Sequence, residues 1–158
     1  MDALTVADAR NIPLPNGCAQ CVVTSPPYYQ QRNYGRDGQI GTENTPSDYV
    51  NAIVCVFREL RRVLKDDGTV WLNLGDTYSN NSLMGIPWRV AIALSDDGWN
   101  LRCDIVWNKP NAMPESVKNR PTRSHEYLFL LSKSKRYKYN NDAIAETAVN
   151  GDGNSPRG

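Results

Sequence analysis

The chain has 158 residues, of which 40% are hydrophobic and 22% charged, and its formal net charge is +1. This length suits a single domain built around one core. A net charge near zero does not by itself require a polyanionic partner. The sequence contains no long apolar run and no recognisable signal peptide, which argues against secretion and against a membrane-spanning protein. We therefore expect a cytoplasmic protein.

The predicted elements alternate between strands and helices. Apolar runs predict strands at residues 4–7 and 20–24. The polar stretch 30–44, rich in Gly, Arg and Tyr, predicts a mobile loop. A helix follows, with Thr45 as N-cap and Pro46 at its first position. Apolar residues then recur at three- and four-residue steps up to Leu64, and the polar run 66–68 is expected to end the helix.

The second half of the chain continues the same alternation. It predicts a strand at 69–74, a helix at 85–94 and strands at 99–107 and 126–131. Strand-helix-strand-helix order is typical of an α/β protein with a mainly parallel sheet. Residues 1–146 are expected to form one domain. Residues 147–158, rich in Gly, Asn, Asp and Ser, are expected to form a flexible tail.

Positive charge is concentrated downstream. Residues 1–100 carry eight Lys and Arg against eleven Asp and Glu, whereas residues 101–158 carry ten against six. Lys and Arg often position nucleic acids by contacting phosphates. Four side chains are candidates for contacts with a DNA backbone: Lys109, Lys118, Arg120 and Arg123. A solvated loop would carry the same charges, so the pattern leaves both interpretations open.

The cysteines do not form a zinc-binding pattern. Cys18 and Cys21 have the C-x-x-C spacing, but no second pair accompanies them and His125 is the only histidine. A structural zinc site needs four ligands. We therefore predict reduced thiols and no metal site.

The most informative segment is the run Thr-Ser-Pro-Pro-Tyr-Tyr at 24–29, directly after an apolar strand. Two successive prolines fix their own φ angles and remove two backbone donors. The remaining polar groups are acceptors: the Ser25 hydroxyl and the carbonyls of Ser25 and Pro26. With a flat ring beside them, these acceptors suit a planar substrate that carries an NH2 group.

The Ser-Pro-Pro-Tyr run resembles the catalytic signature of the β-group amino-methyltransferases of DNA, which methylate cytosine N4 or adenine N6. Segments 62–73, 101–110 and 123–127 are similar to further blocks of that family. The resemblance implies a partial Rossmann-like methyltransferase sheet, α/β and mostly parallel, with a terminal antiparallel strand. It also implies S-adenosylmethionine as cofactor and double-stranded DNA as partner.

The resemblance assigns catalysis to Ser25, Pro26, Pro27 and Tyr28. In this mechanism the Ser25 hydroxyl and the Pro26 carbonyl accept the two N–H groups of the amine. Its base must be flipped out of the duplex to be reached. Tyr28 would then stack on that base.

Other residues have weaker assignments. Tyr29 and Trp107 are further candidates for base stacking, with a core position as the alternative for each. Asp8 and Thr24 are expected near the cofactor. Ser25 favours cytosine N4, and adenine N6 is the alternative. Methylation at carbon-5 of cytosine is excluded because no Pro-Cys pair occurs.

One departure from the family is large. The glycine-rich cofactor loop, Phe-x-Gly-x-Gly, is missing from the 158 residues. We therefore expect the catalytic half only: a fragment, a truncated product, or one part of an assembly in which a second chain supplies the cofactor half. The strand at 20–24 should then expose an unpaired edge. The alternative of another class is a non-catalytic remnant that binds DNA or a partner.

Overall fold

The computed structural model describes residues 4–112 and 114–145. In chain order the elements are β1 (Ala19–Thr24), α1 (Pro46–Val63), β2 (Leu64–Leu74), β3 (Tyr78–Ser79), β4 (Ser82–Leu83), α2 (Ile86–Asp96), β5 (Asn100–Asn108), β6 (His125–Ser132) and a 3-10 turn, Asp142–Ile144. The expected order of strands and helices from residue 20 to residue 131 is confirmed.

A four-stranded sheet in the order β1-β2-β6-β5 forms the centre of the fold. β1 pairs parallel with β2, and β6 pairs antiparallel with both of its neighbours. Three strands therefore share one direction, and the last strand of the chain opposes them. This confirms the expected α/β sheet with an antiparallel final strand. That strand lies inside the sheet, between β2 and β5, and β1 forms an edge.

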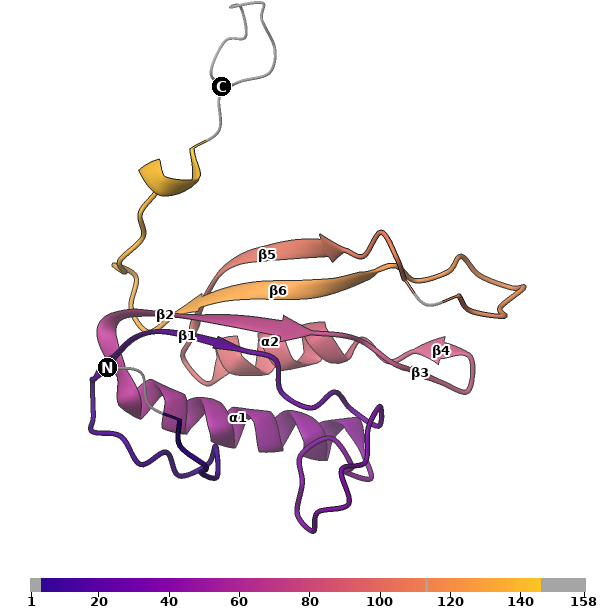
Figure 1. The fold of residues 1–158 in the computed structure, drawn as a ribbon, viewed down its shortest axis with the longest axis horizontal. Helices are drawn as coiled ribbons and strands as arrows, with labels where there is room; N and C mark the ends of the chain where they lie inside the picture. The colour runs from indigo at the N-terminus through magenta and orange to yellow at the C-terminus, as the bar shows by residue number, and fades with distance from the viewer. Residues whose placement is uncertain (1–3, 113, 146–158) are drawn as a thin grey trace, which may run out of the picture.

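Both long helices lie against the same face of the sheet (Figure 1). The apolar stripe of α1 is buried there, with Tyr49 and Ile53 at 0% exposure and Phe57 at 1%. Burial of such a side chain contributes roughly 1.5–3 kcal/mol. On β1, Val22 packs against this core, whereas Val23 points away and is 77% exposed. The edge strand therefore has a covered face and an open face.

The start of α1 matches its sequence signals. Thr45 has extended backbone angles, and its Oγ1 accepts a hydrogen bond from the backbone N–H of Asp48 at 3.1 Å. Pro46 opens the helix, where its missing N–H costs nothing. The end of the helix differs from the prediction. Leu64 is fully buried and already pairs with Ala19 of β1, so the polar run 66–68 lies within β2.

The predicted strand at 4–7 is wrong. Those residues form no strand, and Leu4 and Val6 are 100% and 99% exposed. An apolar run becomes a strand only where another strand accepts its hydrogen bonds. A short hairpin of β3 and β4 was not predicted. Its turn residues Asn80 and Asn81 have φ angles of 49° and 61°, which is the geometry that Asn tolerates in tight hairpin turns.

Three further expectations concern the surface and the ends. The loop at 30–44 contains no helix or strand. All four cysteines are free and exposed. No described helix is long and apolar enough to cross a bilayer. The predicted tail, 147–158, lies outside the described residues.

The cap of α1 gives a stability prediction. Thr45→Ala removes the acceptor of the Asp48 N–H and should lower the free energy of unfolding by about 1 kcal/mol. Urea denaturation measures this change. Ser47→Ala, in the same exposed first turn, is the matched control and should change stability by less than about 0.5 kcal/mol. Equal effects of the two variants would contradict the capping role.

Candidate active site

A pocket of about 640 Å³ lies where β1, β2 and β5 end and β6 begins. The antiparallel strand starts at the edge where the other three finish, so four segments converge there (Figure 1). Ligands of open α/β sheets bind outside the carboxyl ends of the strands. The lining residues are Ser25, Pro26, Pro27, Tyr28, Gln31, Arg32, Tyr34, Gly75, Asp76, Lys109, Ala112, Glu115, Arg123, His125 and Glu126.

The turn after β1 forms one wall of this pocket. The Tyr49 hydroxyl, on the buried stripe of α1, donates to the Pro27 carbonyl at 3.0 Å. Gly41 approaches the turn from the following loop with φ +104°, and a Cβ there would lie 3.0 Å from the Tyr28 carbonyl oxygen. The turn is therefore held by the core on one side and by a glycine that cannot be enlarged on the other.

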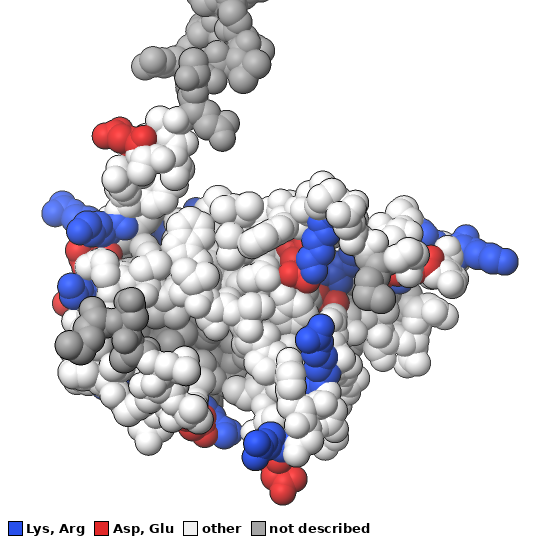
Figure 2. Space-filling view, in the orientation of Figure 1, with Lys and Arg blue, Asp and Glu red and all other residues white. Residues whose placement is uncertain are grey.

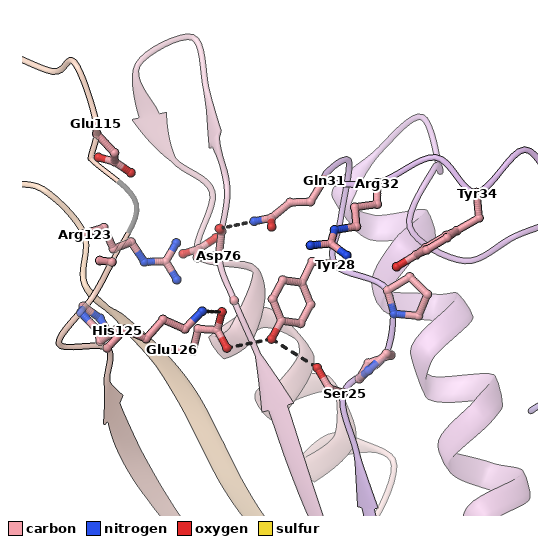
Figure 3. A pocket seen from close by; sticks show the side chains of 15 residues that line it. Ser25, Tyr28, Gln31, Arg32, Tyr34, Asp76, Glu115, Arg123, His125 and Glu126 are labelled. Carbon is pink, nitrogen blue, oxygen red and sulfur yellow. Dashed lines mark hydrogen bonds and ion pairs between the residues drawn. The ribbon is translucent and has the colours of Figure 1, made fainter.

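Tyr28 lies at the centre of the pocket (Figure 3). Its Oη donates to Glu126 Oε2 at 2.9 Å and accepts from Ser25 Oγ at 3.3 Å. Asn73 Nδ2 donates to the same hydroxyl and to the same carboxylate oxygen, each at 3.0 Å. The hydroxyl of Tyr28 thus joins residues from three strand ends.

The Tyr28 ring lies directly on Gly75. A Cβ at Gly75 would lie 2.6 Å from Tyr28 Cε2 and 2.8 Å from Cδ2. These distances are shorter than any normal carbon contact. Glycine at the end of β2 is therefore required by the close approach of this ring.

Glu126 carries the negative charge of the network. Burial disfavours its ionised form, but hydrogen bonds from Lys109, Asn73 and Tyr28 outweigh that cost, so its pKa lies below the ordinary value. Lys109 Nζ forms an ion pair with Glu126 Oε1. Burial, together with the Glu126 carboxylate, raises the pKa of Tyr28 to about 12. At neutral pH the phenol is a hydrogen-bond donor and Glu126 is its charged acceptor.

Asp76 supports the floor of the pocket. It is 7% exposed, and its carboxylate accepts from the backbone N–H groups of Thr77, Gly85 and Ile86 at 2.9–3.0 Å. The last two N–H groups stand at the start of α2, where a carboxylate is favourable. Gln31 donates to the Asp76 carbonyl at 2.9 Å, which ties the loop after β1 to the end of β2.

Two guanidinium groups point into the pocket from opposite walls, those of Arg32 and Arg123 (Figure 3). Neither is in an ion pair within the part of the chain that the structure describes. Figure 2 shows further Lys and Arg side chains along the same end of the molecule, with Asp and Glu among them. Cationic groups therefore surround the opening of the pocket.

The structure brings together Ser25, Pro26, Pro27 and Tyr28 as predicted neighbours of one pocket. Other candidates lie elsewhere. Tyr29 is 4% exposed, and its ring packs 5.5 Å from that of Tyr49. Its core position, the alternative interpretation, therefore leaves it no face for stacking. Trp107 is 53% exposed on β5, opposite Glu126 in register, but outside the pocket lining.

The two residues expected near the cofactor are also outside the pocket lining. Thr24 is the last residue of the edge strand β1, directly before Ser25. Asp8 is exposed and forms an ion pair with Arg10 at 2.8 Å. That pair, with a second bond from the Arg10 backbone, lowers the pKa of Asp8 to about 2.

The basic residues differ in how far they are already engaged. Lys118 is exposed and Arg123 lines the pocket. Arg120 pairs with Glu115 at 2.6 Å, and its guanidinium lies 3.7 Å from the centroid of the Tyr78 ring. These contacts fasten the segment between β5 and β6 to the β3–β4 hairpin, so Arg120 and Lys109 contribute less free charge than their number suggests.

Sequence reasoning missed the polar residues opposite the turn. Asn73, Asp76 and Glu126 each stand at the end of an apolar strand. A polar residue at a strand end near a pocket is the signal that could have identified them. Their convergence required the strand order. Among residues 4–112 and 114–145 there is no group of three or more His, Cys, Asp or Glu that could hold a metal.

The contact between Gly75 and Tyr28 can be tested by a double-mutant cycle. Gly75→Ala should lower the free energy of unfolding by about 1–3 kcal/mol, because the added methyl overlaps the ring. In a Tyr28→Ala background the same change should cost much less, since the ring is gone. Urea unfolding of the four proteins gives the coupling energy. An equal cost in both backgrounds would show that the ring is not what excludes a Cβ.

The charge on Glu126 gives a pH prediction. Because its folded pKa is lowered, its contribution to stability is present above its unfolded pKa, about 4.3, and is lost as pH falls through the folded value. Glu126→Gln should remove this part of the acid dependence. Lys109→Met should raise the folded pKa, so that the loss begins at higher pH. Urea midpoints measured across the acid range check both, and unchanged curves would contradict the network.

Comparison with known proteins identifies the family. The family model N6_N4_Mtase, described as DNA methylase, matches residues 19–158. The chain is 48% identical to the type II methyltransferase M.Cfr9I of Citrobacter freundii, with 87% of this chain and 56% of the relative covered. It is 47% identical to the type II methyltransferase M.SmaI of Serratia marcescens, with 92% and 60% covered.

Solved structures show the same fold. PvuII DNA methyltransferase (cytosine-N4-specific) superposes with a TM-score of 0.74 at 22% identity, covering 88% of this chain and 51% of the other. A DNA modification methylase of Thermus thermophilus, in complex with S-adenosyl-L-methionine, gives 0.64 at 23% identity, covering 87% and 58%. The chain spans a little over half the length of the curated relatives it matches. On the family match and its strand-end site, this chain belongs to the N6_N4_Mtase family of DNA methylases.

Proposed function

We propose that this chain is the catalytic part of a DNA methyltransferase that moves a methyl group from S-adenosylmethionine to the N4 amine of a flipped cytosine. The observation that carries the proposal is the Ser-Pro-Pro-Tyr turn at the strand-end pocket, with acceptors and an aromatic ring on one wall. The family supports methylation of DNA. The choice of cytosine rests on Ser25.

The pocket suits a single base. Its volume of about 640 Å³ lies within the range of small-molecule sites. An amine inside a duplex is out of reach, so the target base must leave the stack. The Tyr28 ring, fixed by Gly75 and the hydroxyl network, would stack on that base, an interaction worth about 1–3 kcal/mol.

Ser25 and Pro26 would activate the amine. Ser25 Oγ donates its proton to Tyr28 Oη, so the lone pairs of Oγ are free to accept an N–H of the substrate. The Pro26 carbonyl accepts no backbone hydrogen bond in the described residues and would take the second N–H. Two such bonds favour a tetrahedral nitrogen whose lone pair can attack in line. Orientation and electrostatic stabilisation then supply the catalysis.

The described residues fit the reacting end of the cofactor. S-adenosylmethionine supplies an electrophilic methyl group on a sulfonium. Thr24 and Ser25 stand at the end of edge strand β1, whose open face is marked by Val23, and Asp8 remains a candidate for the adenosine end. Because β1 has an unpaired edge, we propose that a further segment, in the same protein or in a second chain, completes the cofactor half.

Double-stranded DNA is the proposed partner. Lys118 and Arg123 are the basic residues best placed to reach its phosphates, since Lys109 and Arg120 are engaged in ion pairs. Phosphate contacts of this kind position the protein without reading sequence. The relatives are bacterial, and we propose a bacterial or phage-encoded protein of the cytoplasm.

Methyl transfer to unmethylated genomic DNA tests the proposal. The chain is incubated with DNA and S-adenosylmethionine, and the digested nucleosides are analysed by mass spectrometry. We expect N4-methylcytosine. Ser25→Ala should lower the rate by about 100-fold or more, because the acceptor for the amine is lost. Tyr139→Phe, a change at an exposed residue outside the pocket, is the matched control and should retain the rate.

The other outcomes are distinct. N6-methyladenine as product would overturn the choice of cytosine and support the adenine alternative. Calorimetric titration with S-adenosylmethionine decides between the enzyme and the remnant. A folded chain that neither binds the cofactor nor transfers methyl groups would be a remnant that binds DNA or a partner.

A further inference from the structure

A directed chain of hydrogen bonds leaves the catalytic serine. Ser25 Oγ donates to Tyr28 Oη at 3.3 Å, and Tyr28 Oη donates to Glu126 Oε2 at 2.9 Å. Asn73 Nδ2 donates to both Tyr28 Oη and Glu126 Oε2, which fills their remaining acceptor positions on that side. The protons of the two hydroxyl groups therefore point the same way, from Ser25 toward Glu126 (Figure 3).

The proposed reaction releases a proton at the start of this chain. When an exocyclic amine is methylated, its nitrogen becomes cationic and must lose one N–H proton. The nearest acceptor in the proposed geometry is Ser25 Oγ. A serine hydroxyl is a poor base by itself, so it needs a route by which its own proton can leave at the same time.

We propose that Ser25, Tyr28 and Glu126 form a proton path that takes this proton from the methylated amine to the Glu126 carboxylate, an inference that rests on the proposed function. As the new N–CH3 bond replaces the S–CH3 bond, one amine proton passes to Ser25 Oγ. The Ser25 proton passes to Tyr28 Oη, and the Tyr28 proton passes to Glu126 Oε2. Ser25 and Tyr28 end unchanged, the amine ends neutral, and Glu126 ends protonated.

The surroundings of Glu126 suit the end of such a path. Its side chain is 15% exposed and pairs with Lys109, whose side chain is 45% exposed. The proton can therefore leave to solvent at the rim of the pocket. The charged and titratable groups that line the pocket with Glu126 are Tyr28, Arg32, Tyr34, Asp76, Lys109, Glu115, Arg123 and His125. Glu126 acts through Tyr28 and is a positioning residue, whereas Ser25 would contact the substrate.

The path can be tested first without cofactor or DNA. In the free chain, NMR titration of the Glu126 carboxyl carbon reports its pKa. Tyr28→Phe removes one hydroxyl and keeps the ring, and it should raise the Glu126 pKa because one stabilising donor is lost. Tyr139→Phe should leave the titration unchanged. Identical titrations in the wild type and Tyr28→Phe would overturn the path.

Methyl transfer supplies the second test. In single-turnover assays Tyr28→Phe and Glu126→Gln should each slow transfer by about 100-fold, with the KM for DNA nearly unchanged because the ring remains. The wild-type rate should fall at acid pH as Glu126 is protonated, and Glu126→Gln should lose that acid limb. Glu59→Gln breaks an ion pair with Arg62 far from the pocket and should keep both the rate and the limb.

The outcomes separate the path from the proposed function. Wild-type rates and pH profiles in Tyr28→Phe and Glu126→Gln would overturn the path while leaving the enzyme intact. A wild-type chain that transfers no methyl group would overturn the proposed function for this chain alone. The NMR titration then decides the hydrogen-bonded path: coupled titration supports it and uncoupled titration overturns it.

Discussion

The site depends on the hydrogen bond between the Tyr28 hydroxyl and Glu126. It joins residues 98 positions apart, one after the edge strand and one near the start of the last strand. Asn73, at the end of β2 between them, donates to both groups. Without this bond the ring would be held only by its contact with Gly75, and the carboxylate would lose a donor in a partly buried place. Such networks are costly when half satisfied.

The sheet topology explains why these groups can meet. β1, β2 and β5 run in one direction, and β6 runs against them between β2 and β5. The first residues of β6 therefore lie beside the last residues of its neighbours. A parallel β6 would place Glu126 at the opposite edge of the sheet, a whole strand length from the turn. The antiparallel direction of one strand is thus a requirement of the site.

Charge at the pocket depends on pairing more than on number. The downstream half of the chain has ten Lys and Arg against six Asp and Glu. Lys109 stabilises Glu126 and Arg120 is held by Glu115 and Tyr78, so each serves the internal structure. Arg32 and Arg123 face the cavity. A polyanion approaching this end would meet those two first, which concentrates the attraction at the mouth of the site.

The sequence by itself determined the local features. Thr45 and Pro46 start a helix, apolar spacing buries one face of it, and the run Ser-Pro-Pro-Tyr defines a rigid turn of acceptors, because each depends on neighbouring residues only. Tertiary structure decided the rest. Residues 4–7 found no strand to pair with, Tyr29 was drawn into the core against Tyr49, and Asn73, Asp76 and Glu126 became site residues through strand order and direction. Those outcomes depend on contacts between segments far apart in the chain, and local patterns carry no information about such contacts.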